Sequence, residues 1–307
     1  MAASRPEGKA SEFHLDDTRR GETPRMESPI DSFGRNYLKQ YGFEWERDAV
    51  RVRVQSDLMP LNERLSVSNG VRPADDPRYR SHASVPMWPW RTLDAAECET
   101  LCAPPGQWDM RRMVGVCRFP PSVHRALVRV ALAYANAFNA HDEQGVDVVN
   151  RDAADLLGEY LITREGFGLI GLAARDPGLV TVTPRIETGL LTGLHVDGWD
   201  TFRPVGLATN RVGVNLGKGS RSLLYVPFAA DVLGLTDHKT WDRRIPGFFT
   251  AHPQCPVLRV RIDPGEAYIA PTELALHDGN TEGNQAIDVC LHARGQFGIT
   301  ERFPALG

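Results

Sequence analysis

The second half of the chain has the hydrophobic pattern of a β-rich protein. From about residue 181, short apolar runs alternate with Gly, Pro, Asn and Asp, as in "LVTVTPRI", "NRVGVNLG", "RSLLYVPF", "CPVLRVRIDPG" and "IDVCLHARGQF". Such interrupted runs are typical of the strands of a sandwich or barrel. The stretch "NLGKGSRSLLYVPF" predicts a hairpin with its turn at residues 217–220.

The first half has a different pattern. An alternating "AVRVRVQ" predicts a strand near residues 50–54, and four prolines between residues 72 and 94 predict an irregular connection. Trp88 and Trp90 in that connection are expected to pack it onto the core, with lining of a pocket as the alternative. Two helices are expected, one in "FPPSVHRALVRVALAYANAFNAHDEQG" and one in "RDAADLLGEYLITREG". Residues 1–30 are polar and carry few large apolar side chains, so we expect a flexible tail.

Composition excludes several classes of protein. The 307 residues carry a net charge of -4 and no basic run, which argues against a nucleic-acid partner. No apolar run reaches the roughly 18 to 20 residues that a membrane helix needs, and the N-terminus lacks the apolar stretch of a signal peptide. These features predict a cytoplasmic protein, in which the five scattered cysteines form no disulfides.

The stretch "GLHVDG" holds two potential metal ligands. His195 and Asp197 stand at positions i and i+2, so in a strand their side chains leave from the same face and can reach one ion. Gly193 and Gly198 allow close approach of the backbone at the end of that strand.

A third ligand follows in "DPGEAYIAPTELALHDGN". The Pro264-Gly265 pair predicts a turn, "EAYIA" a short buried strand, and Pro271 the end of its pairing. His277 comes six residues after that proline. About eighty residues separate Asp197 from His277, enough for four strands, so a barrel can bring the two together.

Two histidines and one carboxylate on one face of an octahedral ion leave its other positions open. This is the ligand set of non-haem Fe(II) oxygenases. Three such ligands also suit Zn(II) or Mn(II), and the sequence leaves these metals open.

The turn, strand, proline and histidine resemble the second conserved box of the cupin and jelly-roll oxygenases. With the H-x-D stretch, the chain resembles the iron(II)/2-oxoglutarate-dependent dioxygenases over about residues 181–297. The resemblance implies an α+β fold with a mainly β core, a double-stranded β-helix flanked by helices from the N-terminal half, in one domain over residues 31–307. It also implies that His195, Asp197 and His277 bind Fe(II), with 2-oxoglutarate as cosubstrate and O2 as oxidant.

The resemblance further implies the type of reaction. Halogenating members typically have glycine or alanine in place of the carboxylate, so Asp197 favours hydroxylation or a related oxidation. Size and the single-domain plan resemble bacterial tailoring oxygenases. We therefore expect a small-molecule or peptide substrate, amino-acid-derived or another specialised metabolite.

The family holds the distal carboxylate of 2-oxoglutarate with arginine or lysine, and an arginine fork pairs with both oxygens. Many members place this residue about ten to fifteen positions after the distal histidine, a window without arginine here. Arg294 lies slightly later, on a polar strand face that can point into the barrel. Jumonji-type members take the basic residue from the strand after H-x-D, which makes Arg221 and Arg211 the alternatives.

Other residues near the motifs have lesser expected roles. Trp199 and Asp200 could contact substrate or pack at the rim, and Thr272 and Glu273 are expected to orient His277. His292 ranks below the three ligands as a further candidate. Two other functions stay open: a metal-dependent cupin enzyme that does not use 2-oxoglutarate, and a non-catalytic cupin protein that binds a ligand.

Overall fold

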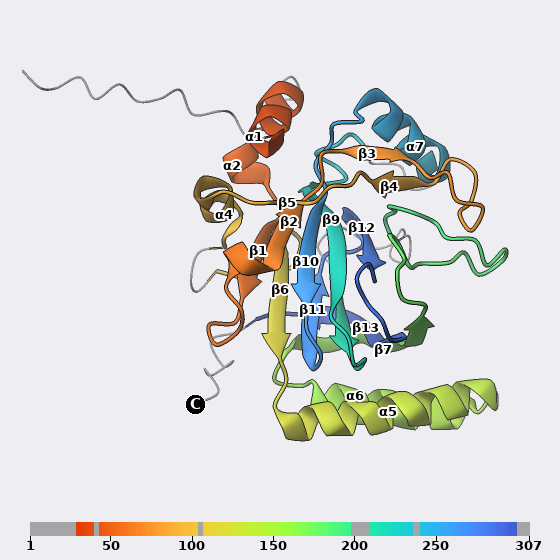
Figure 1. The fold of residues 1–307 in the computed structure, drawn as a ribbon. Helices are drawn as coiled ribbons and strands as arrows, with labels where there is room; N and C mark the ends of the chain where they lie inside the picture. Colours follow the sequence, from red (N-terminus) through yellow and green to blue (C-terminus); the bar gives the residue numbers. More distant parts are fainter. Residues whose placement is uncertain (1–28, 40–42, 104–106, 198–208, 236–239, 300–307) are drawn as a thin grey trace, which may run out of the picture.

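Two β-sheets pack face to face at the centre of the molecule in the computed structural model (Figure 1). The structure describes residues 29–39, 43–103, 107–197, 209–235 and 240–299. Within these residues, the larger sheet has six strands in the order β1-β6-β11-β8-β13-β7, and only its β1–β6 pair is parallel. Its members are β1 (Arg51–Val54), β6 (Met113–Arg118), β7 (Leu161–Arg175), β8 (Asn210–Asn215), β11 (Glu266–Ala270) and β13 (Asp288–Phe297).

The smaller sheet has five strands over the same described ranges, in the order β12-β9-β10-β2-β5, and all of its pairs are antiparallel. Its members are β2 (Leu65–Val67), β5 (Arg91–Thr92), β9 (Arg221–Ala229), β10 (Leu258–Ile262) and β12 (Ala275–Asn280). A separate ribbon pairs β3 (Val71–Pro73) with β4 (Ser84–Pro86). Val116 and Tyr268 of the larger sheet join Leu223 and Val260 of the smaller sheet in one buried cluster, so the two sheets share a core.

Two long helices cover the outer face of the larger sheet. Helices α5 (Pro121–Asn139) and α6 (Glu143–Leu156) lie side by side beneath β7 and β13 in Figure 1. Their Leu127 and Ala153 share a second buried cluster with Val212 of β8 and Leu291 of β13. Alternation along β8 and β13 therefore turns the residues between these apolar positions toward the space between the sheets.

Shorter helices complete the molecule. They are α1 (Pro29–Phe33), the π-helix η1 (Gly34–Leu38), α2 (Trp45–Asp48), α3 (Leu61–Arg64), α4 (Ala95–Leu101) and α7 (Trp241–Ala251). Asp94 and Glu97 cap α4 reciprocally, each side chain accepting a hydrogen bond from the other's backbone. In the part of the chain that the structure describes, no helix has the length and apolarity to cross a membrane.

The mixed α and β character and the sheet-rich core confirm the coarse fold prediction. The strand near residues 50–54 and the strand of "EAYIA" are confirmed as β1 and β11. The N-terminal half contributes more than helices, because β1, β6, β2 and β5 extend both sheets. Residues 1–28 of the expected tail lie outside the described residues.

The predicted hairpin at residues 217–220 is wrong. Strand β8 pairs with β11 and β13, whereas β9 pairs with β10 and β12, so the turn connects the two sheets. Its side chains explain the change of sheet. The Asn215 amide donates to the carbonyl of Ile262 at 3.0 Å, and the Ser220 hydroxyl donates to Asp263 at 2.6 Å, which ties the turn to the β10–β11 loop.

Three further expectations are corrected. The second helix ends at Leu156, and the long strand β7 contains the whole "LITREG" stretch and continues beyond it. Described residues 176–197 form isolated bridges rather than strands, because Pro177, Pro184 and glycines with positive φ interrupt pairing. Helix α7 lies within the part predicted to be all-β. Pro246 and Gly247 inside it disfavour a helix prediction from sequence, yet the helix forms and buries Phe248.

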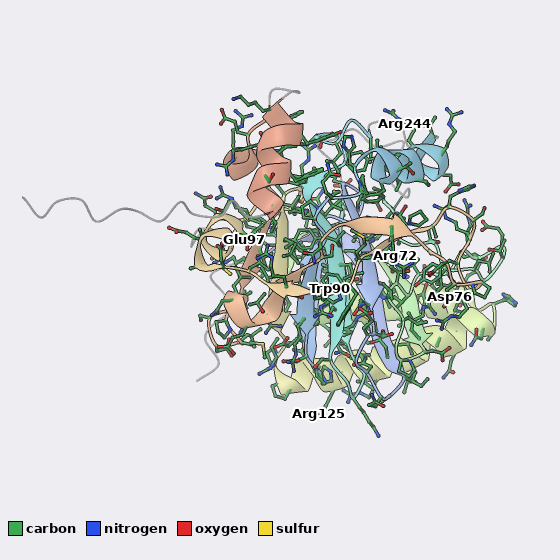
Figure 2. The ribbon with its side chains drawn as sticks, turned by 45° about the horizontal axis from the view of Figure 1, so that its top comes forward. Arg72, Asp76, Trp90, Glu97, Arg125 and Arg244 are labelled. Carbon is green, nitrogen blue, oxygen red and sulfur yellow. The ribbon has the colours of Figure 1, made fainter. Side chains whose placement is uncertain are left out.

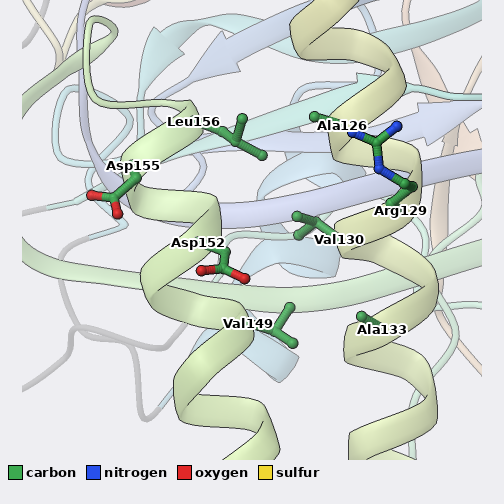
Figure 3. Close-up of a pocket in the computed structure, with 8 residues that line it drawn as sticks. All are labelled: Ala126, Arg129, Val130, Ala133, Val149, Asp152, Asp155 and Leu156. Carbon is green, nitrogen blue, oxygen red and sulfur yellow. The ribbon is translucent and has the colours of Figure 1, made fainter.

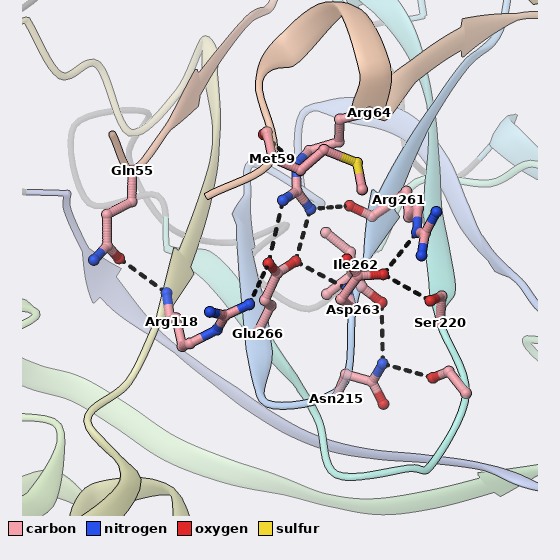
Figure 4. A network of polar contacts seen from close by, with 11 residues as sticks. Gln55, Met59, Arg64, Arg118, Asn215, Ser220, Arg261, Ile262, Asp263 and Glu266 are labelled. Carbon is pink, nitrogen blue, oxygen red and sulfur yellow. Dashed lines mark hydrogen bonds and ion pairs between the residues drawn. The ribbon is translucent and has the colours of Figure 1, made fainter. Parts of the chain in front are cut away.

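A buried ion network links α3 to strands of the two sheets (Figure 4). The guanidinium of Arg64, fully buried, donates to both oxygens of Glu266, at 2.7 and 3.2 Å. Arg118 and the backbone N–H of Asp263 donate to the same carboxylate, and Arg64 also reaches the carbonyl of Arg261. The network joins α3, β6, β10 and β11, which come from distant parts of the chain.

Replacing Glu266 with glutamine should leave Arg64 charged and buried without a counter-ion. We expect Glu266→Gln to lower the free energy of unfolding by about 3 to 5 kcal/mol, because removing one partner of a buried pair leaves the other uncompensated. Urea denaturation followed by circular dichroism measures the change. Glu63→Gln, on the exposed face of α3, is the matched control, and an equal effect in both variants would contradict the role of the network.

Candidate metal centre

Backbone hydrogen bonds bring the three predicted ligands together. His195 and His277 form an antiparallel bridge, in which each backbone N–H donates to the other's carbonyl, at 3.1 and 2.8 Å. The N–H of Asp197 donates to the carbonyl of Thr272 at 3.0 Å. These bonds fasten the H-x-D segment to β12 and to the turn before it, so the long sequence separation is closed by main-chain contacts.

The side chains converge on one point. One ligand atom from each of His195, Asp197 and His277 lies within 4.8 Å of the other two, and no other such group occurs among the described residues. Nε2 of His195 is 3.7 Å from Oδ1 of Asp197, and Nε2 of His277 is 3.6 Å from its Oδ2. An ion that bonds to all three atoms at about 2.0 to 2.2 Å would require these ligand atoms to move only slightly closer to one another.

The backbone also fixes the orientation of both imidazoles. Nδ1 of His195 lies 2.9 Å from the carbonyl of Gly193, and Nδ1 of His277 lies 3.0 Å from the carbonyl of Ala275. A carbonyl oxygen only accepts, so each Nδ1 carries a proton and each Nε2 is the nitrogen that can bind an ion. Both Nε2 atoms face Asp197, which fits the donor set of a metal centre.

Glycine is required at position 193. Its φ is +77°, in the left-handed region, and a Cβ there would lie 2.6 Å from the carbonyl oxygen of Ser84. This conformation points the Gly193 carbonyl at the His195 ring, so the expected close backbone approach is confirmed. Gly198 lies outside the described residues.

The carboxylate has a cationic partner. Arg211, on β8, places Nη2 2.6 Å from Oδ2 of Asp197. Burial alone would raise the pKa of Asp197, but the positive charges of Arg211 and the histidines hold that pKa well below its usual range. Asp197 is therefore an anion, and its two oxygens face the Nε2 atoms of the two histidines.

The two histidines differ in their protonation. Burial opposes the charged form of His195, but contacts with Asp197 and Asp278 outweigh it and raise the pKa of His195 to about 10. Burial dominates at His277 and lowers its pKa to about 4. Without a metal ion, Nε2 of His195 is therefore protonated and faces the carboxylate of Asp197.

The predicted arginines lie at different places between the sheets. Arg211 contacts Asp197, as described. Arg294 lies directly opposite Arg211 on β13 and is partly buried. Arg221, at the start of β9, is buried and reaches across to the larger sheet, where its Nη1 lies 3.4 Å from Oδ2 of Asp288.

Arg221 and Asp288 have unused hydrogen-bonding capacity. Nε and Nη1 of Arg221 and both carboxylate oxygens of Asp288 are buried and make no hydrogen bond of good geometry within the structure. The guanidinium lies beside Gly279, where a Cβ would be 2.6 Å from Nη2. Buried polar atoms left in this way are costly unless a ligand completes them.

The residues with lesser expected roles are placed as follows. His292 is outside the ligand group, and its Nδ1 lies 3.5 Å from the Tyr268 hydroxyl. Thr272 supports Asp197 through its carbonyl, whereas the carbonyl of Ala275 orients His277. Trp199 and Asp200 lie outside the described residues.

Trp88 and Trp90, in the irregular connection before α4, have different environments. Trp90, labelled in Figure 2, packs under the guanidinium of Arg259 with 4.5 Å from the carbon to the ring centre, and its Nε1 donates to Glu282. It also packs against the core, as predicted. Trp88 is 78% exposed, so its predicted packing is wrong.

Two polar residues near the centre, Tyr268 and Asp278, were not predicted from the sequence, and Asp288 was placed on the polar face of its strand without a role. Alternation in "EAYIA" could have put Tyr268 on the inner face of its strand as well. Asp278 directly follows His277, and its role depends on a neighbouring segment that alternation does not identify.

A separate groove lies far from this chemistry in the fold. It has a volume of about 530 Å³ between α5 and α6, and Figure 3 shows its apolar floor of Val130, Val149 and Leu156 with Arg129 and Asp152 beside it. Because these helices cover the outer face of the larger sheet, the sheet separates this groove from the ligand triad.

Comparisons with known proteins do not assign the chain. No protein-family model matches it, and neither the curated proteins nor the solved structures include a significant match. The geometry of the triad and its surroundings is therefore the basis for a functional proposal.

Metal binding should release one proton, which comes from His195. That imidazole is charged below its pKa of about 10, whereas His277, with a pKa of about 4, is already neutral near pH 7. A metal ion takes only the neutral ring, so raising the pH removes the competing proton. We expect the apparent affinity for Zn(II) or Co(II) to rise about tenfold per pH unit between about pH 6 and pH 8.

Competition with a chromophoric chelator at several pH values measures this affinity. Calorimetry in two buffers of different ionisation enthalpy counts the released protons independently. An affinity that does not change over this range would contradict the assigned protonation.

Proposed function

We propose that the protein is an Fe(II)/2-oxoglutarate-dependent oxygenase that hydroxylates a small-molecule or peptide substrate. The observation that carries the proposal is the convergence of His195, Asp197 and His277 with both Nε2 atoms directed inward and both Nδ1 atoms held by carbonyls. This set leaves several positions of an octahedral ion free for other ligands.

The path of the chain supports the proposed double-stranded β-helix. After β7, the H-x-D segment pairs with β12 of the smaller sheet, β8 lies in the larger sheet and β9 in the smaller. Strand β10 stays beside β9, and then β11, β12 and β13 alternate between the sheets. This gives β7-β13-β8-β11 facing H-x-D segment-β12-β9-β10, the strand arrangement expected for that fold.

Arg221 is the best candidate to hold the distal carboxylate of 2-oxoglutarate. It is buried, charged and left with unused donors, which suits an incoming oxyanion. Its guanidinium lies beside Gly279, two residues from His277, or about 7 Å along an antiparallel strand. That spacing is comparable with the reach of a five-carbon dicarboxylate whose other end binds the metal.

The position of Asp288 adds a reason for this choice. It falls in the window after His277 where many family members carry the clamping arginine. Here Asp288 instead pairs with Arg221 from the opposite sheet at 3.4 Å. Arg211 is engaged by Asp197, which leaves it less suited to the distal carboxylate.

Each part of the centre has a distinct task in the proposed reaction. Bound Fe(II) would supply the oxidation of substrate by O2, coupled to conversion of 2-oxoglutarate to succinate and CO2. Arg211 pairs with Asp197, which would restrict rotation of that carboxylate while it holds the metal with the two histidines. The buried surroundings of His277 and Asp197 exclude water from the reacting groups.

The three ligands should be indispensable for turnover. We expect Fe(II)-dependent formation of succinate from 2-oxoglutarate in the native protein. His195→Ala, Asp197→Ala and His277→Ala should each lower it by more than the about 10- to 100-fold typical of losing a residue behind a metal ligand. His124→Ala, on α5 outside the larger sheet, is the control and should retain activity. Equal turnover in the native protein and all three ligand variants would reject the proposal.

Removing the charge of Arg221 should weaken cosubstrate binding. Arg221→Gln alone leaves Asp288 buried and unpaired, so the informative protein is the double variant Arg221→Gln/Asp288→Asn, which removes both charges. We expect its dissociation constant for 2-oxoglutarate to rise about tenfold to hundredfold, the range for losing charged hydrogen bonds. Anaerobic calorimetry with Fe(II)-loaded protein measures the change.

Arg294→Gln is the comparison for that experiment, because Arg294 is the other leading candidate. A larger loss of affinity in Arg294→Gln than in the double variant would move the clamp to Arg294. Absence of any 2-oxoglutarate binding by the metal-loaded native protein would instead favour a cupin enzyme with a different cosubstrate.

A further inference from the structure

A buried carboxylate stands behind the metal centre. Asp278 follows the ligand His277 on β12, is 1% exposed, and does not belong to the ligand triad. The side chains of His277 and Asp278 both approach the ring of His195. A buried aspartate needs donors or a cationic partner, and each of its two oxygens meets this need differently.

Oδ1 of Asp278 is fully engaged. It accepts hydrogen bonds from the backbone N–H groups of Val182, Thr183 and Gly279, at 3.1, 3.1 and 2.7 Å, and from the Thr183 hydroxyl at 2.9 Å. These bonds tie the segment before the H-x-D stretch to β12. They also restrict rotation of the carboxylate, so the direction of the second oxygen is set.

Oδ2 of Asp278 points at a metal ligand. It is buried, has no hydrogen-bond partner of its own within the structure, and lies 3.5 Å from Nδ1 of His195. That nitrogen carries the proton donated to the Gly193 carbonyl at 2.9 Å, on the side of the ring away from Asp197. A carboxyl oxygen therefore faces the N–H of the imidazole whose Nε2 is directed at the other two ligands.

We propose that Asp278 is a positioning residue for His195, which holds the Nδ1-protonated form of the ring and strengthens Nε2 as a metal ligand. A carboxylate next to the N–H of a ligating histidine increases the electron density available at the other nitrogen. His277 has no equivalent carboxylate among the described residues, since only the Ala275 carbonyl bonds to its Nδ1. The two histidines are thus unequal ligands. This inference rests on the proposed metal centre.

The test compares two variants that separate charge from structural support. Asp278→Asn keeps the size of the side chain and removes its charge, whereas Thr183→Val keeps the charge and removes one hydrogen bond to Oδ1. We expect Asp278→Asn to weaken Co(II) binding about tenfold to hundredfold, as for other residues behind metal-ligating histidines, and Thr183→Val to change it by less than about threefold. Chelator competition at one fixed pH measures both.

A spectroscopic readout distinguishes positioning from loss of stability. In the Co(II) protein, the Nδ1 protons of two ligating histidines give exchangeable, paramagnetically shifted proton resonances. We expect one resonance, that of His195, to move or to exchange faster with solvent in Asp278→Asn, while that of His277 stays in place. Melting temperatures of the metal-free proteins show the structural cost of each variant. If Asp278→Asn does not fold, Asp278→Ser retains an acceptor toward the same backbone donors.

The outcomes are separable. If native protein does not bind Co(II) through the triad, the metal centre itself is wrong. If native protein binds and Asp278→Asn binds equally with unchanged resonances, Asp278 has no positioning role. If Asp278→Asn and Thr183→Val lose the same affinity and the same stability, Asp278 acts only as a structural support, and the inference is overturned.

Discussion

The reciprocal backbone bridge between His195 and His277 is the contact on which the proposed centre depends. Two main-chain hydrogen bonds set the separation of two imidazoles that are far apart in sequence. Their ring orientations are then fixed by the carbonyls of Gly193 and Ala275, again from the backbone. The centre is therefore preorganised by main-chain geometry, and side-chain packing needs only to keep water and competing rotamers out.

Charge is arranged in pairs along the space between the sheets. Asp197 with Arg211, Asp288 with Arg221, and Glu266 with Arg64 each join elements from different parts of the chain. Glu266 is saturated with donors, whereas the pair of Arg221 and Asp288 is not. The first arrangement suits a permanent structural contact. The second suits a contact that opens for a ligand, because its unmet hydrogen bonds lower the cost of rearrangement.

Much of the candidate centre could be predicted from sequence because its signals are local. The H-x-D spacing, the Pro264-Gly265 turn and the buried "EAYIA" strand each lie within a few residues, and His195, Asp197 and His277 are brought together as predicted. The sequence did not show which strands belong to which sheet, because strand pairing depends on contacts between distant residues. The turn at residues 217–220 has hairpin composition, but Asn215 and Ser220 anchor it to a loop more than forty residues away. Asp278 was missed because its partners, Val182 and Thr183, come from an irregular segment without periodicity.

The place of Arg221 beside Gly279 has a consequence for molecular discrimination. Backbone pairing between β9 and β12 sets where the main chains of Arg221 and His277 lie, so the sheet sets much of the gap between the guanidinium and the imidazole. If a dicarboxylate bound between the metal held by His277 and the guanidinium of Arg221, the sheet would select it by its length. A diacid one carbon shorter would then span the gap less well, and a longer one would have to bend to fit it.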